Sequence, residues 1–246
     1  MNIAIIFAGG VGQRLNKSAD SVPKQFIEIY GKPILAHTLT IFQNHNEIDK
    51  IYISILPEYK EHCIKMIEKY SFNKVVGVVD GGETAQESIY NGLNLAYAEN
   101  PKDSIVLIHD GVRPIVEDSV ISANIKSVKE NGTAITSTPC YETILISSEG
   151  KVPKEIPIRR ETYAAQAPQS FVLEEIFEAH NIIRQRENKY QDIVDSCTLY
   201  NVLGKQTHLV KGNFGNIKIT TPQDLFILRG ILEFKENYES FSLEAK

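Results

Sequence analysis

Residues that could hold phosphate groups gather near the start of the chain. Gly9, Gly10 and Gly12 directly follow an apolar run, where glycines let backbone N–H groups approach a phosphate closely. Arg14 and Lys24 follow within about fifteen residues of these glycines. Two cations beside a glycine-rich loop suit a triphosphate better than a redox cofactor. A tight strand-to-helix turn with ordinary surface charges is the competing interpretation.

Two familiar nucleotide-binding patterns do not fit this loop. Leu15 stands at the third glycine position of the dinucleotide fingerprint, and Pro23 interrupts the helix that should begin there. The loop also lacks the GK[ST] sequence of a P-loop. The pattern therefore disfavours a dinucleotide-dependent oxidoreductase.

A second group of chemically useful residues forms the sequence HDGVRP. Asp110 follows an apolar run, and an aspartate at the carboxyl end of a strand can hold a divalent metal between phosphates. Arg113 can hold a second anionic group. An Asp–Arg pair that only rigidifies the turn before Pro114 is the alternative. His109 fits a structural role better than that of a base.

Four further positions are weaker candidates. Gly82 and Ser88 lie in a segment that resembles a helix N-terminus, whose fixed donors and acceptors could read a base edge, although an ordinary helix cap has the same sequence. Lys218 is a cation among apolar neighbours near a predicted strand end, where lysines usually bury the stem and expose the ammonium. Arg159 is expected to be exposed.

The candidate loops follow short apolar runs that are typical of buried strands. These runs are residues 2–7, 50–56, 74–79 and 104–109. Segments with helical spacing of apolar residues lie between them, at 33–42, 57–70 and 83–97. The alternation predicts an α/β fold with a mainly parallel sheet and helices on both faces. Ligands of such sheets bind at the carboxyl ends of the strands, so the loops are expected to carry the site.

The regular alternation stops after Gly132. Residues 138–169 contain four prolines, and the alternating run ETILIS at 142–147 predicts a strand before a turn. We expect a hairpin-like arm that projects from the core. Further helices are predicted at 173–188, at 192–201 and after Pro222, with a strand at 207–212.

Composition narrows the class of protein. The 246 residues are 42% hydrophobic and carry a formal charge of −5, which predicts a single domain over 1–246 without affinity for nucleic acid or an anionic membrane. The three cysteines are far apart and odd in number, as in a reducing compartment. The first apolar run is too short for a membrane span and lacks the basic leader of a signal peptide, so a cytoplasmic location is expected.

Six motifs in one order resemble a known family. They are GGxGxR, PKQF, GGxxxxxS, HDxxRP, an arginine ten residues before the glutamine of PQSF, and NIKIT followed by a proline. This order is similar to that of 2-C-methyl-D-erythritol 4-phosphate cytidylyltransferase and ribitol-5-phosphate cytidylyltransferase, from Asn2 to about Leu228. The resemblance implies a Rossmann-like nucleotidyltransferase fold, an Mg²⁺ cofactor, and a homodimer whose exchanged arms, at about 138–169, complete the partner's site.

The resemblance also implies a CTP site. Gly82 and Ser88 are expected near the cytosine, and Asp110 beside the metal and the ribose. Arg14 and Lys24 look like the groups that neutralise the triphosphate. The other nucleotide-binding positions carried over are Ala8, Gly9, Gly10 and Gly12.

A polyol phosphate is the implied second ligand. Lys218 is expected to bridge its phosphate and the α-phosphate of the nucleotide, while Arg113 helps to place it. Arg159 and Thr143 are expected to arrive from the other subunit and grip the acceptor's phosphate. The residues expected to be catalytic are Arg14, Lys24 and Lys218.

The acceptor is expected to be D-ribitol 5-phosphate, because Val112 and the arm sequence IPIRRETYAAQAPQSF resemble the ribitol enzymes more closely. Ala167 and Gly215 depart from the family pattern near the acceptor and the metal. Methylerythritol phosphate or another polyol phosphate therefore stays open. A ribitol product would feed teichoic acid or capsule-type polymers, and a methylerythritol product isoprenoid synthesis. A silent nucleotide-binding protein is the non-enzyme alternative, which retention of the charged motif residues disfavours.

Overall fold

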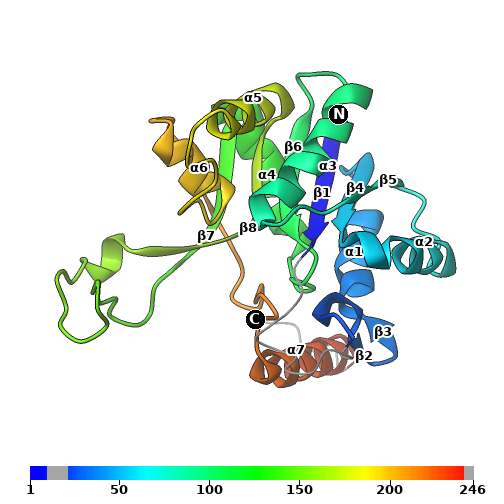
Figure 1. The fold of residues 1–246 in the computed structure, drawn as a ribbon. Helices are drawn as coiled ribbons and strands as arrows, with labels where there is room; N and C mark the ends of the chain where they lie inside the picture. The colour runs from blue at the N-terminus through cyan, green and yellow to red at the C-terminus, as the bar shows by residue number, and fades with distance from the viewer. Residues whose placement is uncertain (10–21, 241–246) are drawn as a thin grey trace.

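The computed structural model describes residues 1–9 and 22–240. Within these residues, one sheet contains β1 (Asn2–Ala8), β4 (Lys50–Ile55), β5 (Val75–Asp80), β6 (Ile105–Asp110), β7 (Thr133–Pro139), β8 (Tyr163–Val172) and β9 (Leu209–Lys211). The strand order is β5-β4-β1-β6-β8-β7-β9 (Figure 1). β1 pairs in parallel with both β4 and β6, and β4 pairs in parallel with β5. The four apolar runs of the sequence are therefore confirmed as adjacent parallel strands.

One strand of the sheet runs against the others. β8 is antiparallel to both β6 and β7, whereas β7 pairs in parallel with β9. The sequence analysis did not predict β7 or β8. The sequence of β8, YAAQAPQSFV, is rich in alanine and glutamine and contains a proline, which are residues without strong strand preference. Its position depends on long-range pairing with β6 and β7.

Helices cover both faces of the sheet, as predicted. They are α1 (Ile34–Asn44), α2 (Lys60–Lys69), α3 (Ala85–Glu99), α4 (Asp118–Asn131), α5 (Leu173–Arg184), α6 (Ser196–Val202) and α7 (Pro222–Ser240). One buried cluster joins α1, α2 and α4 to the sheet, and a second joins α3, α5 and α6 to it. Ala4 and Ile6 of β1 belong to the first cluster and Ile3 and Ile5 to the second. Successive side chains of a strand point to opposite faces, so a continuous apolar run fits a doubly covered sheet.

An arm leaves the body between β7 and β8, as predicted (Figure 1). The end of β7 pairs with the beginning of β8 at its base, from Ser137 opposite Ala165 to Pro139 opposite Tyr163. The predicted strand at 142–147 is wrong, because this region has only one isolated bridge, between Ile146 and Glu155. The apolar side chains of that run are exposed, and the arm offers no sheet against which an alternating pattern could bury one face.

The last helix packs beside the strand ends. Figure 1 shows α7 on the side of the sheet toward which β1 points. A third buried cluster contains Ile29, Ile34, Val112, Ile115, Ile219 and Leu228. It joins α7 and α1 to the loop after β6. The remaining short elements are β2 (Glu28–Ile29), β3 (Lys32–Pro33) and the 3₁₀ turns η1 (Lys24–Phe26), η2 (Pro57–Tyr59) and η3 (Arg159–Glu161).

The helices and the cysteines bear on the expectations about membrane spans and disulfides. Of the helices in the described part of the chain, none combines the length and apolar character that crossing a membrane requires. All three cysteines are free, with Cys63 buried and Cys140 and Cys197 partly exposed.

His180 is a buried titratable group of α5. Its side chain is fully buried, and its Nδ1 lies 2.7 Å from the hydroxyl oxygen of Tyr190. The ring of Tyr90 on α3 lies 6.1 Å away, between centroids. Burial, assisted by the positive charge of Arg184, lowers the pKa of His180 from 6.5 to about 3. The folded protein therefore holds this imidazole neutral.

We predict that acid destabilises the fold through His180. The unfolded chain binds a proton near pH 6.5 that the folded chain accepts only near pH 3, so the stabilisation is present above pH 6.5 and is lost as the pH falls. Between pH 7 and pH 5 this group should lower the free energy of unfolding by about 2 kcal/mol. Urea unfolding of the wild type and of His180→Phe at both pH values measures the effect. Equal pH dependence in the two proteins would contradict it.

Candidate active site

The ends of β1 and β5 bring a glycine loop against the start of α3. A β-carbon on Gly9 would lie 2.6 Å from Ser88 Oγ, so glycine permits an approach that other residues would disturb. Ser88 Oγ donates to the carbonyl oxygen of Thr84 at 3.0 Å and accepts from the N–H of Gly82 at 3.0 Å. Three residues that the sequence analysis placed in two separate motifs, Gly9, Gly82 and Ser88, therefore lie together.

A cavity of about 330 Å³ lies beside this loop. Lys24 reaches its edge from η1, and its Nζ donates to the carbonyl oxygen of Ile219 at 3.2 Å. Phe7, Leu56 and Val112 give the cavity apolar walls. The candidate residues that line it are Ala8, Gly9, Lys24, Gly82, Ser88, Asp110 and Lys218. Parts of five motifs from distant regions of the sequence thus meet at one cavity.

A buried carboxylate pairs with two cations at the end of β6. Asp110 Oδ1 lies 2.6 Å from Lys218 Nζ, and Asp110 Oδ2 lies 2.8 Å from Arg113 Nε. The Asp110 side chain is only 8% exposed. Burial alone would raise the pKa of Asp110, but the charges of Lys218 and Arg113 outweigh it and lower this pKa to about 2. Asp110 is therefore ionised at neutral pH.

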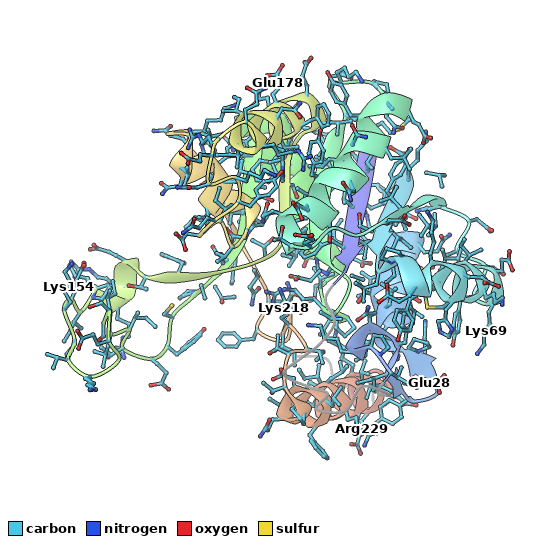
Figure 2. All side chains as sticks on the ribbon, viewed as in Figure 1. Glu28, Lys69, Lys154, Glu178, Lys218 and Arg229 are labelled. Atoms are coloured by element: carbon cyan, nitrogen blue, oxygen red, sulfur yellow. The ribbon has the colours of Figure 1, made fainter. Side chains whose placement is uncertain are left out.

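Two loops cross to position these charges. The segment that carries Lys218 is not a strand; it is held by a hydrogen bond from the Ile219 N–H to the Val112 carbonyl oxygen at 3.0 Å. Arg113 Nη1 donates to the carbonyl oxygen of Asn216 at 2.8 Å. Figure 2 shows Lys218 in the resulting position between the sheet and α7. The HDGVRP and NIKIT motifs therefore form one bonded unit.

His109 supports this unit from inside. Its ring is fully buried against Phe42, with Nε2 3.1 Å from the carbonyl oxygen of Arg113. Burial lowers the pKa of His109 to about 4, so the imidazole is neutral at pH 7. A neutral ring that bonds the turn on which Arg113 lies agrees with the structural role expected from the sequence.

A second cavity, of about 190 Å³, adjoins the first. Arg113 lines this smaller cavity, together with residues of β8 and α6 that include Gln166, Gln169 and Ser196. Both cavities are lined by Phe7, Ala85, Asp110 and Lys218. The Asp110–Lys218 pair therefore stands where the two cavities meet.

The sequence analysis missed the polar wall that α6 contributes. Gln169 Nε2 donates to Asp195 Oδ2 at 2.8 Å, and Gln169 Oε1 accepts from the N–H of Cys197 at 2.9 Å. Asp195 Oδ1 also accepts from the N–H of Thr198 at 2.8 Å and so caps α6. The capping aspartate before an apolar segment was a readable helix signal. Its proximity to β8 was not, because it depends on tertiary packing.

Five candidates are not among the described residues that line the two cavities. Gly10, Gly12 and Arg14 lie outside the described residues. Thr143 and Arg159 lie on the arm, where both are exposed. Neither contributes to the lining of the two cavities within this chain.

The side chains around the two cavities bear on whether a metal ion can bind there. Among the described residues, no three His, Cys, Asp or Glu side chains form a group that could hold a metal alone. Of the carboxylates in the described part of the chain, Asp110 alone lines both cavities, and each of its oxygens has a second acceptor position beyond the bonds to Lys218 and Arg113. Mg²⁺ often binds one or two carboxylates together with substrate phosphates and water. Asp110 fits a metal carried largely by a nucleotide.

Comparisons with known proteins identify the family to which this chain belongs. Residues 2–233 match the family described as 2-C-methyl-D-erythritol 4-phosphate cytidylyltransferase (IspD). The chain is 41% identical to a ribitol-5-phosphate cytidylyltransferase of Streptococcus agalactiae, covering 99% of this chain and 100% of the relative. It is 39% identical to a 2-C-methyl-D-erythritol 4-phosphate cytidylyltransferase of Clostridium botulinum, covering 94% and 97%.

Solved structures give the same answer for the fold. The crystal structure of a 4-diphosphocytidyl-2C-methyl-D-erythritol synthase from Anaerococcus prevotii matches with a TM-score of 0.80 and 28% identity, covering 94% of this chain and 96% of that one. The predicted nucleotidyltransferase fold is therefore confirmed. The chain belongs to the IspD family of cytidylyltransferases, which are CTP-dependent nucleotidyltransferases.

Proposed function

We propose that this chain transfers CMP from CTP to D-ribitol 5-phosphate, giving CDP-ribitol and pyrophosphate. The observation that carries the proposal is the meeting of two cavities at Asp110 and Lys218. Two anionic substrates that react with each other need adjoining sites with positive charge at the junction. The full-length likeness to a ribitol-5-phosphate cytidylyltransferase supports the choice of acceptor.

CTP occupies the larger cavity in this proposal. Its triphosphate lies against the loop of Gly9 and near Lys24, and its cytosine lies near Gly82 and Ser88. The hydrogen bond from the Gly82 N–H to Ser88 Oγ fixes the polar atoms of these two residues. Gly10, Gly12 and Arg14 complete the same loop in the sequence, and the family resemblance supports assigning them to the triphosphate. Mg²⁺ on Asp110 would supply further positive charge to the phosphates.

The acceptor occupies the smaller cavity, with its phosphate near Arg113 and Lys218. A phosphate monoester is largely ionised at pH 7, so the acceptor's own oxygen is the nucleophile. This oxygen attacks the α-phosphorus of CTP; a new P–O bond forms while the bond to the β-phosphate oxygen breaks, and pyrophosphate leaves. Lys218, Lys24 and Arg14 offset the repulsion between the anions. No serine, cysteine or histidine nucleophile is needed.

The residues that line the smaller cavity, and not Val112, are the ones placed to select the acceptor. Val112, whose type resembles the ribitol enzymes, lines only the larger cavity. Selection of the acceptor therefore falls to the walls made by α3, β8 and α6 and to the arm. Ala85 and Ile89 give one wall an apolar character that would also suit the methyl group of methylerythritol phosphate. Methylerythritol phosphate is therefore the second candidate acceptor. Ala167, which departs from the family pattern, also lines this cavity, so another polyol phosphate is a third candidate.

The active unit in this proposal is a homodimer with exchanged arms. Thr143 and Arg159 reach the acceptor's phosphate from the partner. The arm also exposes apolar side chains, including Leu145, Val152 and Ile156. Exposed apolar side chains on a projecting segment are typical of a surface that a partner covers.

The identity of the product decides which biosynthetic pathway the reaction would serve. CDP-ribitol would serve the synthesis of teichoic acid or capsule-type polymers, whereas a methylerythritol product would serve isoprenoid synthesis. We propose a cytoplasmic location, which the free thiols of Cys63, Cys140 and Cys197 support.

A panel of acceptors tests the reaction. With CTP and Mg²⁺, we expect pyrophosphate release with D-ribitol 5-phosphate, at a kcat/KM at least about tenfold above that with methylerythritol 4-phosphate. Higher kcat/KM with methylerythritol 4-phosphate would assign the chain to isoprenoid synthesis. Absence of pyrophosphate with every acceptor would favour a silent nucleotide-binding protein.

Lys218→Met tests the cation at the junction. Because it removes charge from the point where the anions meet, kcat should fall about a hundredfold or more. The melting temperature should also fall, because Lys218 helps to stabilise the buried Asp110 carboxylate, so kcat is measured at a temperature where circular dichroism shows the variant to be folded. Lys211→Met, which removes an exposed lysine of β9, is the control and should keep wild-type kcat. Near-normal turnover by Lys218→Met would remove this residue from the mechanism.

Mixing two inactive variants tests the exchange of arms. If Arg159 acts in the partner's site, a heterodimer of Lys218→Met and Arg159→Ala subunits has one intact site. Random mixing should therefore restore about a quarter of the wild-type sites. The measurement is turnover after the two variants are unfolded and refolded together, compared with each refolded alone. No gain on mixing would show that Arg159 acts within its own chain or not at all.

A further inference from the structure

The smaller cavity contains buried polar groups whose hydrogen-bonding capacity is unused. Ser196 is 1% exposed, and its Oγ has no hydrogen-bond partner among the described residues. Gln166 Oε1 is likewise buried without a partner in the described part of the chain. Both residues line the cavity that Arg113 and Lys218 also line, one from α6 and the other from β8. A buried polar group without a partner destabilises the empty protein, and a ligand can supply that partner.

The neighbours of Ser196 are already bonded to each other. Gln169 joins β8 to α6 through the Asp195 carboxylate and the Cys197 N–H, and Asp195 also accepts from Thr198. Arg113 is held in the same way by Asp110 and by the carbonyl oxygen of Asn216. These bonds fix the position of Ser196 and leave its hydroxyl as a group that can accept and donate within the cavity.

The charges along the cavity indicate which part of a ligand reaches Ser196. Arg113 and Lys218 supply positive charge that attracts a phosphate, and Asp110, which pairs with both, neutralises one of these two charges. Asp195 brings a carboxylate beside Ser196, and a carboxylate repels a phosphate but accepts hydrogen bonds from hydroxyl groups. The α6 wall therefore suits the uncharged, hydroxyl-bearing part of a sugar-alcohol phosphate.

We propose that the Ser196 hydroxyl bonds a hydroxyl group of the acceptor's carbon chain and so determines which sugar-alcohol phosphate is used. This inference rests on the proposed function, because it assigns the smaller cavity to the acceptor. It adds a residue outside the motifs that carry the family resemblance. Gln166, also with an unused polar atom, offers a second contact from β8.

The test is Ser196→Ala, measured by pyrophosphate release with CTP and Mg²⁺. We expect KM for ribitol 5-phosphate to rise about five- to tenfold, as for loss of one hydrogen bond between uncharged groups. KM for CTP and kcat should change little, because Ser196 does not line the larger cavity. Ser196→Thr keeps a hydroxyl and should recover part of the loss.

Ser104→Ala is the matched control. Ser104 is also fully buried, and its Oγ also lacks a partner in the described residues, but it precedes β6 and lines neither cavity. The substitution removes the same atom from an equally buried place. It should leave KM for ribitol 5-phosphate unchanged, so a general effect of deleting a buried hydroxyl is separated from a contact with the acceptor.

A comparison of stereoisomers sharpens the test. The 5-phosphates of ribitol, xylitol and arabinitol differ only in where their hydroxyl groups point, so Ser196→Ala should narrow the differences in kcat/KM among them. Unchanged KM and unchanged preference in Ser196→Ala would overturn this inference alone. Absence of turnover by the unmodified protein with every acceptor would overturn the proposed function, and this inference with it.

Discussion

The buried carboxylate of Asp110 is the interaction on which the site depends. It binds Lys218 at 2.6 Å and Arg113 at 2.8 Å, and the two cations come from loops that are about a hundred residues apart in the sequence. Without the carboxylate, these cations would repel each other in a partly dry environment. The Asp110 carboxylate holds Lys218 and Arg113 in place near the junction of the two cavities. The bonds around His109 and Ile219 hold the same loops and make the arrangement rigid.

The topology of the sheet explains why two cavities adjoin. Parallel strands β1, β5 and β6 end at one edge and provide the glycine loop and Asp110. β8 enters beside β6 in the opposite direction, so its middle residues reach the same edge and bring α6 with them. A fully parallel sheet would have placed another strand-to-helix loop there. The reversed strand instead supplies a separate polar wall next to the glycine loop.

The sequence predicted the parts of this molecule whose signals are local. The runs at 2–7 and 104–109 are apolar because both faces of their strands are buried, so their positions were readable. The run at 142–147 also has strand-forming residues, but it has no sheet to join, and that prediction was wrong. Residues in contiguous motifs, such as Asp110, were found. Ser196 was not found, because only the packing of α6 on β8 brings it to the cavity.

The continuity of β8 has a mechanical consequence. Its first residues, Tyr163 to Ala165, pair with β7 at the base of the arm, and Gln166, Ala167 and Gln169 line the smaller cavity. Between these two parts, the pairing of β8 with β7 changes register. A displacement of the arm would reach the cavity wall through backbone that the arm base and the wall share. A contact made by the arm and the shape of the smaller cavity therefore depend on the same strand, β8.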